Sequence, residues 1–208
     1  MTSFQRLDYQ RTIIGYHGCD KAVAAEVLQN HQHLRPSENT YDWLGKGVYF
    51  WEHAPRRALE FAHEQKRRGK VEEPAVLGAY IHLGRCFDLT DVEHTRQLGV
   101  AYGDFSDIIS EEGRSVPVNR AAAYDDHDLL LRELDCALIN WYMGQLDSGV
   151  EDTYDYQTLR GVFQEGAAAF SGSKIREKSH IQICVRDPQC VIGYFLPTTH
   201  FGEGGGNE

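Results

Sequence analysis

Two short stretches carry the residue types that could hold a flat polar ligand. Residues 42–52, DWLGKGVYFWE, place a Gly-Lys-Gly turn directly before a run of strand-forming residues that includes Tyr49. Glycine lets a turn reach positive φ, or lets a ligand approach the backbone closely. Upstream, residues 13–16 form an apolar stretch that ends in His17 and Gly18. An aromatic ring can stack on a flat ligand, and a neutral imidazole can hydrogen-bond its hydroxyl groups.

A third stretch lies near the end of the chain. Residues 179–185, SHIQICV, are typical of a strand, and RDPQ and a last strand over residues 190–196 follow. Tyr-His-Gly, Gly-x-Tyr-Phe about thirty residues later and this late strand together resemble the diphtheria-toxin and poly(ADP-ribose)-polymerase branch of the ADP-ribosyltransferases. In that branch a His, a Tyr and an acidic residue lie around NAD. The resemblance leaves residues 83–154 unmatched.

The resemblance implies that His17, Tyr49 and Gln182 are catalytic residues. His17 would bind ribose hydroxyls and Tyr49 would stack on nicotinamide, while Gln182 stands where most relatives carry Glu. An amide can orient a ribose hydroxyl, but it gives no negative charge to an oxocarbenium-like ribose. We therefore expect Glu165, or less readily Glu52, to supply a carboxylate. Replacing either Gln182 or Glu165 should then lower transfer activity.

The resemblance also implies which residues bind NAD. The backbone of Gly18 would hold the nicotinamide carboxamide, and Phe61 on the following helix would form the wall opposite Tyr49. The polar loop over residues 30–46, with Asn39, would lie over NAD, and Gly47 follows it directly. Near position 58 the family carries a small hydroxyl residue, where this chain has alanine, so one bond to the carboxamide is expected to be missing.

Each of these residues also has an ordinary structural explanation. His17 could be a satisfied core histidine, and Tyr49 could belong to a plain core strand. Glu52 could be a charge at a helix N-terminus, and Glu165 a solvated loop residue. The cysteines and histidines show no metal-binding spacing, so we predict no metal site.

The predicted function is transfer of one ADP-ribose from NAD to a macromolecule, protein or nucleic acid, with release of nicotinamide. The size of the chain resembles small bacterial toxin or phage-defence transferases, for which an inhibitory partner protein is expected. One alternative is an inactive module that binds NAD or a partner. Another is an NAD-dependent RNA 2′-phosphotransferase, which needs basic residues, and few stand near His17 or Gln182 apart from Arg176, Lys178 and Arg186.

Periodicity and end signals place the elements that would position these residues. We expect strands over residues 12–16, 48–51, 76–83, 159–163, 179–185 and 190–196. We expect helices over residues 21–29, 55–68 and 128–143, helical pieces around 93–98 and 105–110, a turn over 144–149 and a mobile loop over 167–178. Asp20 is the expected N-cap of the first helix, and Pro55 the expected start of the second.

Composition sets the remaining limits. The chain has 208 residues, is 41% hydrophobic and carries a net charge of −10, which argues against non-specific adhesion to nucleic acid or anionic membranes. Five scattered cysteines are typical of reduced thiols in a cytoplasmic protein, and we expect no membrane association. We predict a single domain over residues 1–201 and a disordered tail over 202–208.

The predicted fold class is α+β. By resemblance it would be the ADP-ribosyltransferase fold, in which two small, mostly antiparallel sheets pack around an NAD cleft with flanking helices.

Overall fold

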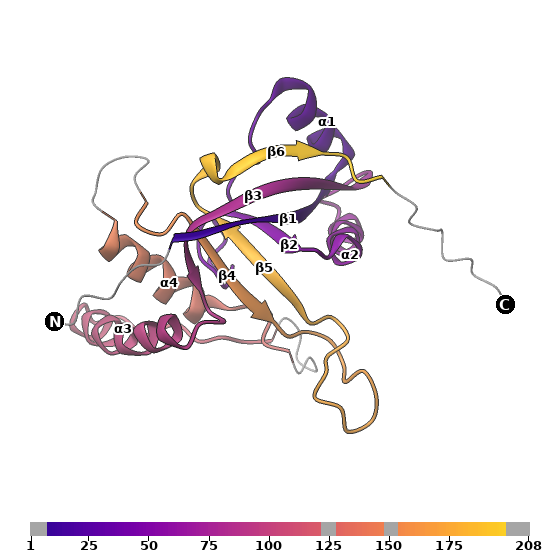
Figure 1. Ribbon diagram of the computed structural model, residues 1–208. Coiled ribbons are helices and arrows are strands. Elements are labelled where there is room, and N and C mark those ends of the chain that lie inside the picture. Colours follow the sequence, from indigo (N-terminus) through magenta and orange to yellow (C-terminus); the bar gives the residue numbers. More distant parts are fainter. Residues whose placement is uncertain (1–7, 122–127, 148–153, 199–208) are drawn as a thin grey trace.

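The computed structural model describes residues 8–121, 128–147 and 154–198 (Figure 1). The predicted tail over residues 202–208 lies outside the described residues. The elements are β1 (Asp8–Asp20), α1 (Lys21–Asn30), β2 (Val48–Glu52), α2 (Pro55–Arg67), β3 (Pro74–Asp88), α3 (Val92–Glu111), α4 (Glu133–Leu146), β4 (Thr158–Phe163), β5 (His180–Val185), the 3-10 helix η1 (Pro188–Cys190) and β6 (Val191–Phe195).

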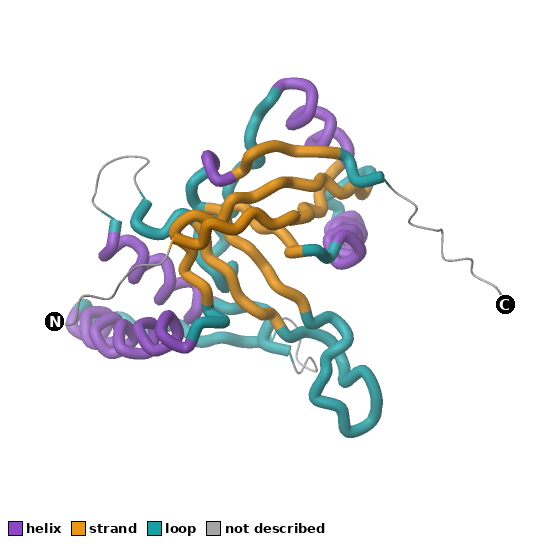
Figure 2. The backbone as a smooth tube through the Cα atoms, viewed as in Figure 1, coloured by secondary structure: helices purple, strands orange, loops and turns teal. Residues whose placement is uncertain are grey.

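The strands form one six-stranded sheet in the order β1-β2-β5-β4-β3-β6 (Figure 2). Strand β1 also pairs with β3, so the pairings connect β1, β2, β5, β4 and β3 in a closed circuit. Among the described pairs only β3–β4 is parallel. The α+β, mostly antiparallel class is therefore confirmed. The prediction of two separate sheets is wrong, because β1 pairs with β2 and the long β3 continues into a pairing with β4.

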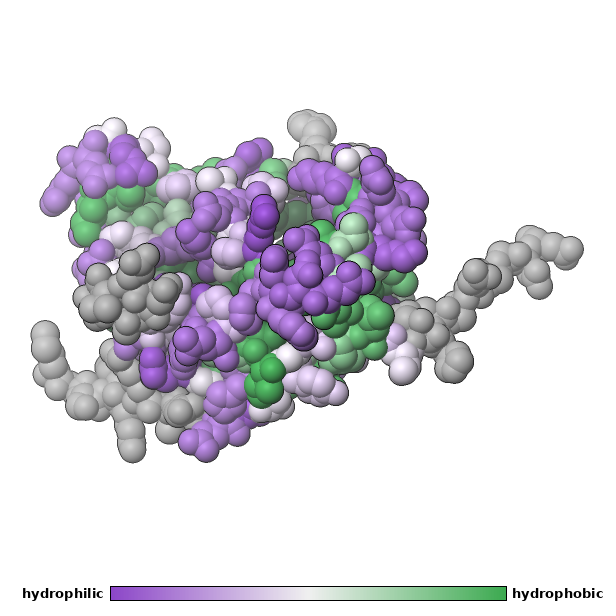
Figure 3. Space-filling view, turned by 90° about the horizontal axis from the view of Figure 1, so that it is seen from above, coloured by the Kyte–Doolittle hydropathy of each residue, from purple (hydrophilic) through white to green (hydrophobic). Residues whose placement is uncertain are grey.

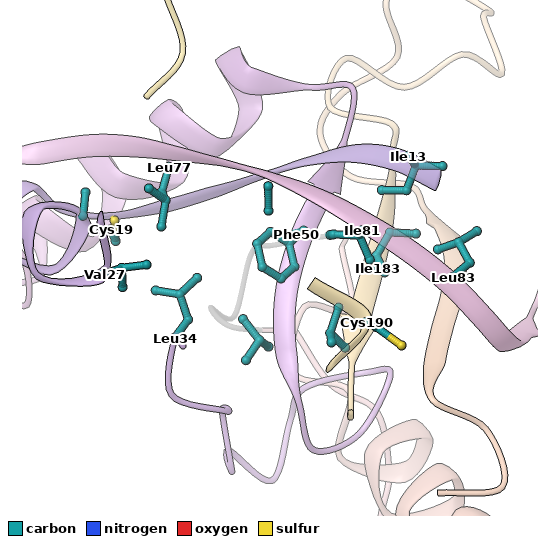
Figure 4. Packing of buried hydrophobic residues seen from close by; sticks show 14 of the residues in the cluster. Ile13, Cys19, Val27, Leu34, Phe50, Leu77, Ile81, Leu83, Ile183 and Cys190 are labelled. Atoms are coloured by element: carbon teal, nitrogen blue, oxygen red, sulfur yellow. The ribbon is translucent and has the colours of Figure 1, made fainter. Parts of the chain in front are cut away.

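Phe50 lies at the centre of the main core (Figure 4). It is fully buried among side chains from β1, β3 and β5, including Ile13, Leu77, Ile81 and Ile183. A Cβ atom at position 15 would lie 2.8 Å from Phe50 Cβ, so glycine is required where β1 crosses β2. The strand over VYFWE is thus a core strand, as its large residues predict.

The helices pack on different parts of this sheet. α2 packs against β1 and β3, while α4 covers Leu44, Tyr49 and Leu159 and packs against α3 on its other side. The expected N-cap is confirmed, since the Asp20 carboxylate accepts from the Ala22 N–H, and α2 begins at Pro55 as predicted. No helix among the described residues is long and apolar enough to cross a membrane. Figure 3 shows one face, on which hydrophilic residues surround smaller apolar areas.

Several predicted boundaries need correction. β1 and β3 are longer than expected because they pair with each other from Asp8–Arg85 to Asp20–Pro74. The predicted helical pieces at 93–98 and 105–110 are one continuous helix, α3. Gly99 and Gly103 do not interrupt it. A Cβ atom at either position would meet no other atom, so each glycine only lowers the helix propensity.

The helix predicted over residues 128–143 begins later, at Glu133, and runs past Gly144. Asp128 therefore lies outside α4. Its carboxylate accepts from the Gly166 N–H at 2.6 Å and from Arg176 at 2.7 Å, which ties this segment to the loop before β5. Arg132 pairs with Asp135 at 2.8 Å where α4 begins.

Candidate functional site

The three positions expected around NAD lie on three neighbouring strands. His17 is on β1, Tyr49 on β2 and Gln182 on β5, and these strands are adjacent in the sheet. In the register, Trp51 pairs with Tyr16 on one side and with Gln182 on the other. The fold therefore brings residues far apart in the sequence into one part of the sheet.

The His17 side chain is hydrogen-bonded to the backbone of the second motif. Its Nδ1 lies 2.8 Å from the Tyr49 carbonyl oxygen. A carbonyl only accepts, so Nδ1 carries the proton and Nε2 keeps its lone pair. Burial lowers the pKa of His17, although the bond to the Tyr49 carbonyl opposes this shift. At neutral pH His17 is thus a neutral imidazole whose Nε2 can accept a hydroxyl proton.

Tyr49 is fixed by the turn that precedes it. Its hydroxyl donates to the Gly45 carbonyl at 2.8 Å and accepts from the Leu44 N–H at 3.0 Å. The ring packs against the cluster that includes Leu44 and Ile139, and burial raises the pKa of Tyr49 well above its usual value. With its hydroxyl occupied, Tyr49 could contact a ligand only through its ring.

Gln182 is covered by a residue that sequence reasoning missed. The Trp43 indole Nε1–H donates to Gln182 Oε1 at 2.5 Å. The Trp43 ring lies over Gly161, which pairs with Gln182 in the sheet, and a Cβ atom at Gly161 would collide with that ring. A tryptophan within a polar loop was the signal in the sequence that could have identified this contact.

Two glycines predicted to bind NAD have packing reasons for lacking a side chain. A Cβ atom at Gly18 would collide with the Ala58 carbonyl oxygen of α2. A Cβ atom at Gly47 would lie 2.5 Å from Cys184 Sγ and 2.7 Å from the Val185 carbonyl oxygen on β5. Close approach is therefore required at both positions, and in this structure the approaching group is protein backbone or side chain; NAD binding by these glycines stays a prediction.

The other two predicted NAD contacts lie apart from each other. Asn39 is exposed, and its amide donates to Ser37 at 2.8 Å and Asp42 at 3.3 Å, which shapes the loop before β2. Phe61 packs on Trp51, with ring centroids 5.0 Å apart. Phe61 packs in a different cluster from Tyr49, and its role as the wall opposite Tyr49 stays a prediction.

Both candidate carboxylates are engaged by arginines. Glu165 is buried, and its Oε2 accepts from Arg57 Nη2 at 2.8 Å. Glu52 accepts from Arg160 Nε at 2.7 Å, and the same guanidinium lies 3.1 Å from Asp88. Both guanidinium groups are largely buried, so these are interior ion pairs. Within the described part of the chain, neither carboxylate is hydrogen-bonded to Gln182.

A cavity of about 640 Å³ lies at the N-terminus of α2, between it and residues 177–180. Arg57 and His180 line it, and Arg57 Nη1 and His180 Nε2 have no hydrogen-bond partner among the residues that the structure describes. Burial lowers the pKa of His180, which favours its neutral form. His180 precedes Gln182 by two residues on β5, about 7 Å along a strand.

None of the five cysteines forms a disulfide, and all five are buried, as predicted from their scattered positions. Among residues 8–121, 128–147 and 154–198, no group of three His, Cys, Asp or Glu side chains is placed to hold a metal ion.

Comparison with known proteins gives one similarity. No family model matches the chain, and no solved structure matches it. The "Uncharacterized protein MJ0359" of Methanocaldococcus jannaschii is 30% identical over 90 residues, which cover 42% of this chain and 42% of that protein. The chain thus matches less than half of that relative's length, and the relative's description names no activity.

Proposed function

We propose that the chain is an NAD-dependent mono-ADP-ribosyltransferase, with NAD bound across β1, β2 and β5. The observation that carries the proposal is the hydrogen bond from His17 Nδ1 to the Tyr49 carbonyl oxygen. It joins the two motifs and leaves His17 Nε2 as an acceptor. The position of Gln182 on the next strand supports the same site. A neutral acceptor and an aromatic ring on adjacent strands suit a ribose joined to a flat heterocycle.

In the proposed reaction the bond between ribose C1′ and nicotinamide nitrogen breaks, and its electron pair leaves with nicotinamide. The acceptor nucleophile forms a new bond to C1′ and loses its proton. When water is the acceptor, the product is free ADP-ribose. His17 and Gln182 would orient the ribose, and the ring of Tyr49 would hold nicotinamide, so catalysis would depend mainly on positioning.

The acceptor would approach beside the loop over residues 167–178. This loop extends away from the sheet in Figure 2 and leads into β5. Phe170 and Ile175 are each 65% exposed on it. Exposed apolar side chains next to a reaction site are suited to hold a macromolecule. Exchanging this loop should therefore change which macromolecule is modified more than it changes NAD hydrolysis.

The test is to incubate the purified chain with NAD and to measure nicotinamide release. Mass spectrometry of lysate protein and nucleic acid after incubation with labelled NAD would identify the acceptor. A role as a bacterial toxin or defence effector, held in check by a partner protein, is part of this proposal. It predicts that expression slows growth of a bacterial host and that Tyr49→Ala relieves this effect.

An inactive NAD-binding module is the second candidate, and one observation favours it. Glu52 and Glu165 are both paired with buried arginines, so neither is free to stabilise an oxocarbenium-like ribose. Such a module would bind NAD, measured by calorimetry, without releasing nicotinamide. His17→Ala should weaken that binding sharply, and an unchanged affinity in a folded variant would contradict any NAD site at β1.

The RNA 2′-phosphotransferase alternative receives less support. The basic residues expected to bind a 2′-phosphate are already paired: Arg176 with Asp128, Lys178 with Glu64 and Arg186 with Asp147. A phosphate would have to displace carboxylates from all three.

A further inference from the structure

We propose that Trp43 holds the side-chain amide of Gln182 with its NH2 group toward the ligand. The third position of the site would then donate hydrogen bonds and could not accept them. This inference rests on the proposed function, because it identifies a ribose hydroxyl oxygen as the partner of that NH2 group. Trp43 acts through Gln182 and is therefore a positioning residue.

The orientation of Gln182 follows from the chemistry of its partner. An indole N–H can only donate, so the Gln182 atom at 2.5 Å from Trp43 Nε1 must be the carbonyl oxygen Oε1. The opposite end of the amide, Nε2, has no hydrogen-bond partner among the side chains and backbone that the structure describes. Gln182 is partly exposed, so this NH2 group remains available to a ligand.

Trp43 is itself held from several sides. Its ring lies over Gly161, where any side chain would collide with it, and packs on Phe163 with centroids 5.4 Å apart. The Arg132 guanidinium lies 6.0 Å from the Trp43 ring. The next residue, Leu44, donates its N–H to the Tyr49 hydroxyl. The indole therefore has a fixed position, and the Gln182 amide has one preferred orientation.

The two open atoms of the site then have opposite polarity. His17 Nε2 accepts, and Gln182 Nε2 donates. Each polarity suits a hydroxyl of NAD: one that donates its proton to His17 Nε2, and one whose oxygen accepts from Gln182 Nε2. A carboxylate at position 182 would instead require a hydroxyl to donate at both points. An amide takes no proton during the reaction, so Gln182 would act by orientation alone.

A double-mutant cycle tests this arrangement. Trp43→Phe removes the N–H but keeps a ring over Gly161, so the Gln182 amide becomes free to flip. We expect kcat for NAD hydrolysis to fall about tenfold with KM within about twofold. In the Gln182→Glu background both side-chain oxygens accept, so there is no orientation to lose, and Trp43→Phe should cost less than about twofold. An equal loss in both backgrounds would mean that Trp43 has only a structural role.

Matched variants and a binding measurement complete the test. Trp141→Phe makes the same change on α4, and Gln164→Glu makes the same change at an exposed position, and both should leave kcat within about twofold of the parent. By NMR without NAD, Gln182→Leu should move the Trp43 indole N–H signal upfield, and an unmoved signal would overturn the orientation. In the parent, added NAD should shift the Gln182 NH2 signals, and no shift would overturn the role of Gln182 toward the ligand.

These measurements also separate this inference from the proposed function. If the parent releases no nicotinamide but NAD still shifts the Gln182 NH2 signals, the transferase proposal fails while the orientation of Gln182 stands. If nicotinamide is released at equal rates by the parent and Trp43→Phe, the transferase proposal stands and the role of Trp43 is wrong.

Discussion

The residues at the centre of the candidate site and the carboxylates at its margins have different kinds of partners. At the centre, His17, Tyr49 and Gln182 are neutral, and their bonds go to backbone groups or to a neutral indole. At the margins, Glu52 and Glu165 are paired with buried guanidinium groups. His17 and Gln182 each keep one nitrogen without a hydrogen-bond partner among the described residues, whereas both carboxylates pair with arginines inside the fold. We therefore expect ligand binding to depend on the neutral residues and stability to depend on the charged ones.

The largest effect is expected at the centre, for Tyr49→Ala. It removes the ring face proposed to hold nicotinamide, so NAD turnover should fall at least about a hundredfold. It also removes packing against α4, at a cost of about 3 kcal/mol of stability. Tyr49→Phe keeps the ring and should retain much of the activity. If folded Tyr49→Ala turns over NAD like the parent, the nicotinamide site lies elsewhere.

At the margin, Arg160→Met should mainly lower stability. It leaves Glu52 and Asp88 buried without their shared partner, which commonly costs about 3–5 kcal/mol. Urea unfolding measures the loss. Arg96→Met is the control, because Arg96 pairs with Glu93 on the exposed surface of α3, where a pair contributes about 0–1 kcal/mol. Equal losses in the two variants would remove the distinction between an interior pair and a surface pair.

Glu165→Gln tests whether Glu165 contributes to stability, like the other paired carboxylate, or to turnover, like the central residues. Its side chain holds Arg57, so we expect a lower melting temperature, from a loss of about 1–3 kcal/mol, because the guanidinium loses its nearest counter-charge and keeps, among the described residues, only Glu60 and Glu64 at 3.8–4.0 Å. Turnover measured well below that temperature should stay within about threefold of the parent. A hundredfold fall in kcat with unchanged stability would instead support the catalytic role expected from the sequence.

The smallest effect concerns acid stability. Burial lowers the pKa of both His17 and His180 below the unfolded value of 6.5. Below that pH the unfolded chain binds protons that the folded chain does not, so stability should fall as the pH drops from 6.5 toward the folded pKa values. The slope cannot exceed about 1.4 kcal/mol per pH unit for each histidine. His180→Gln should flatten the dependence, and an unaltered slope would show that His180 titrates normally.

The local sequence pattern was sufficient to predict much of the fold. The Asp20 cap, the Pro55 helix start and the aromatic strand before Glu52 follow from local backbone and side-chain preferences, which act over a few residues. Local signals were misleading where distant pairing decided the outcome. The length of β3 depends on β1, and the continuity of α3 depends on its packing against α4.

The sequence alone determined which residues are the candidates, because the types and order of His17, Tyr49 and Gln182 are visible without a structure. Only the tertiary structure decided how they are used. Whether Glu165 is free or paired depends on Arg57, which is 108 positions away, and the orientation of Gln182 depends on Trp43, which is 139 positions away. Hydrogen bonds and ion pairs of this kind are set by distance and angle in space, and sequence separation carries no information about either.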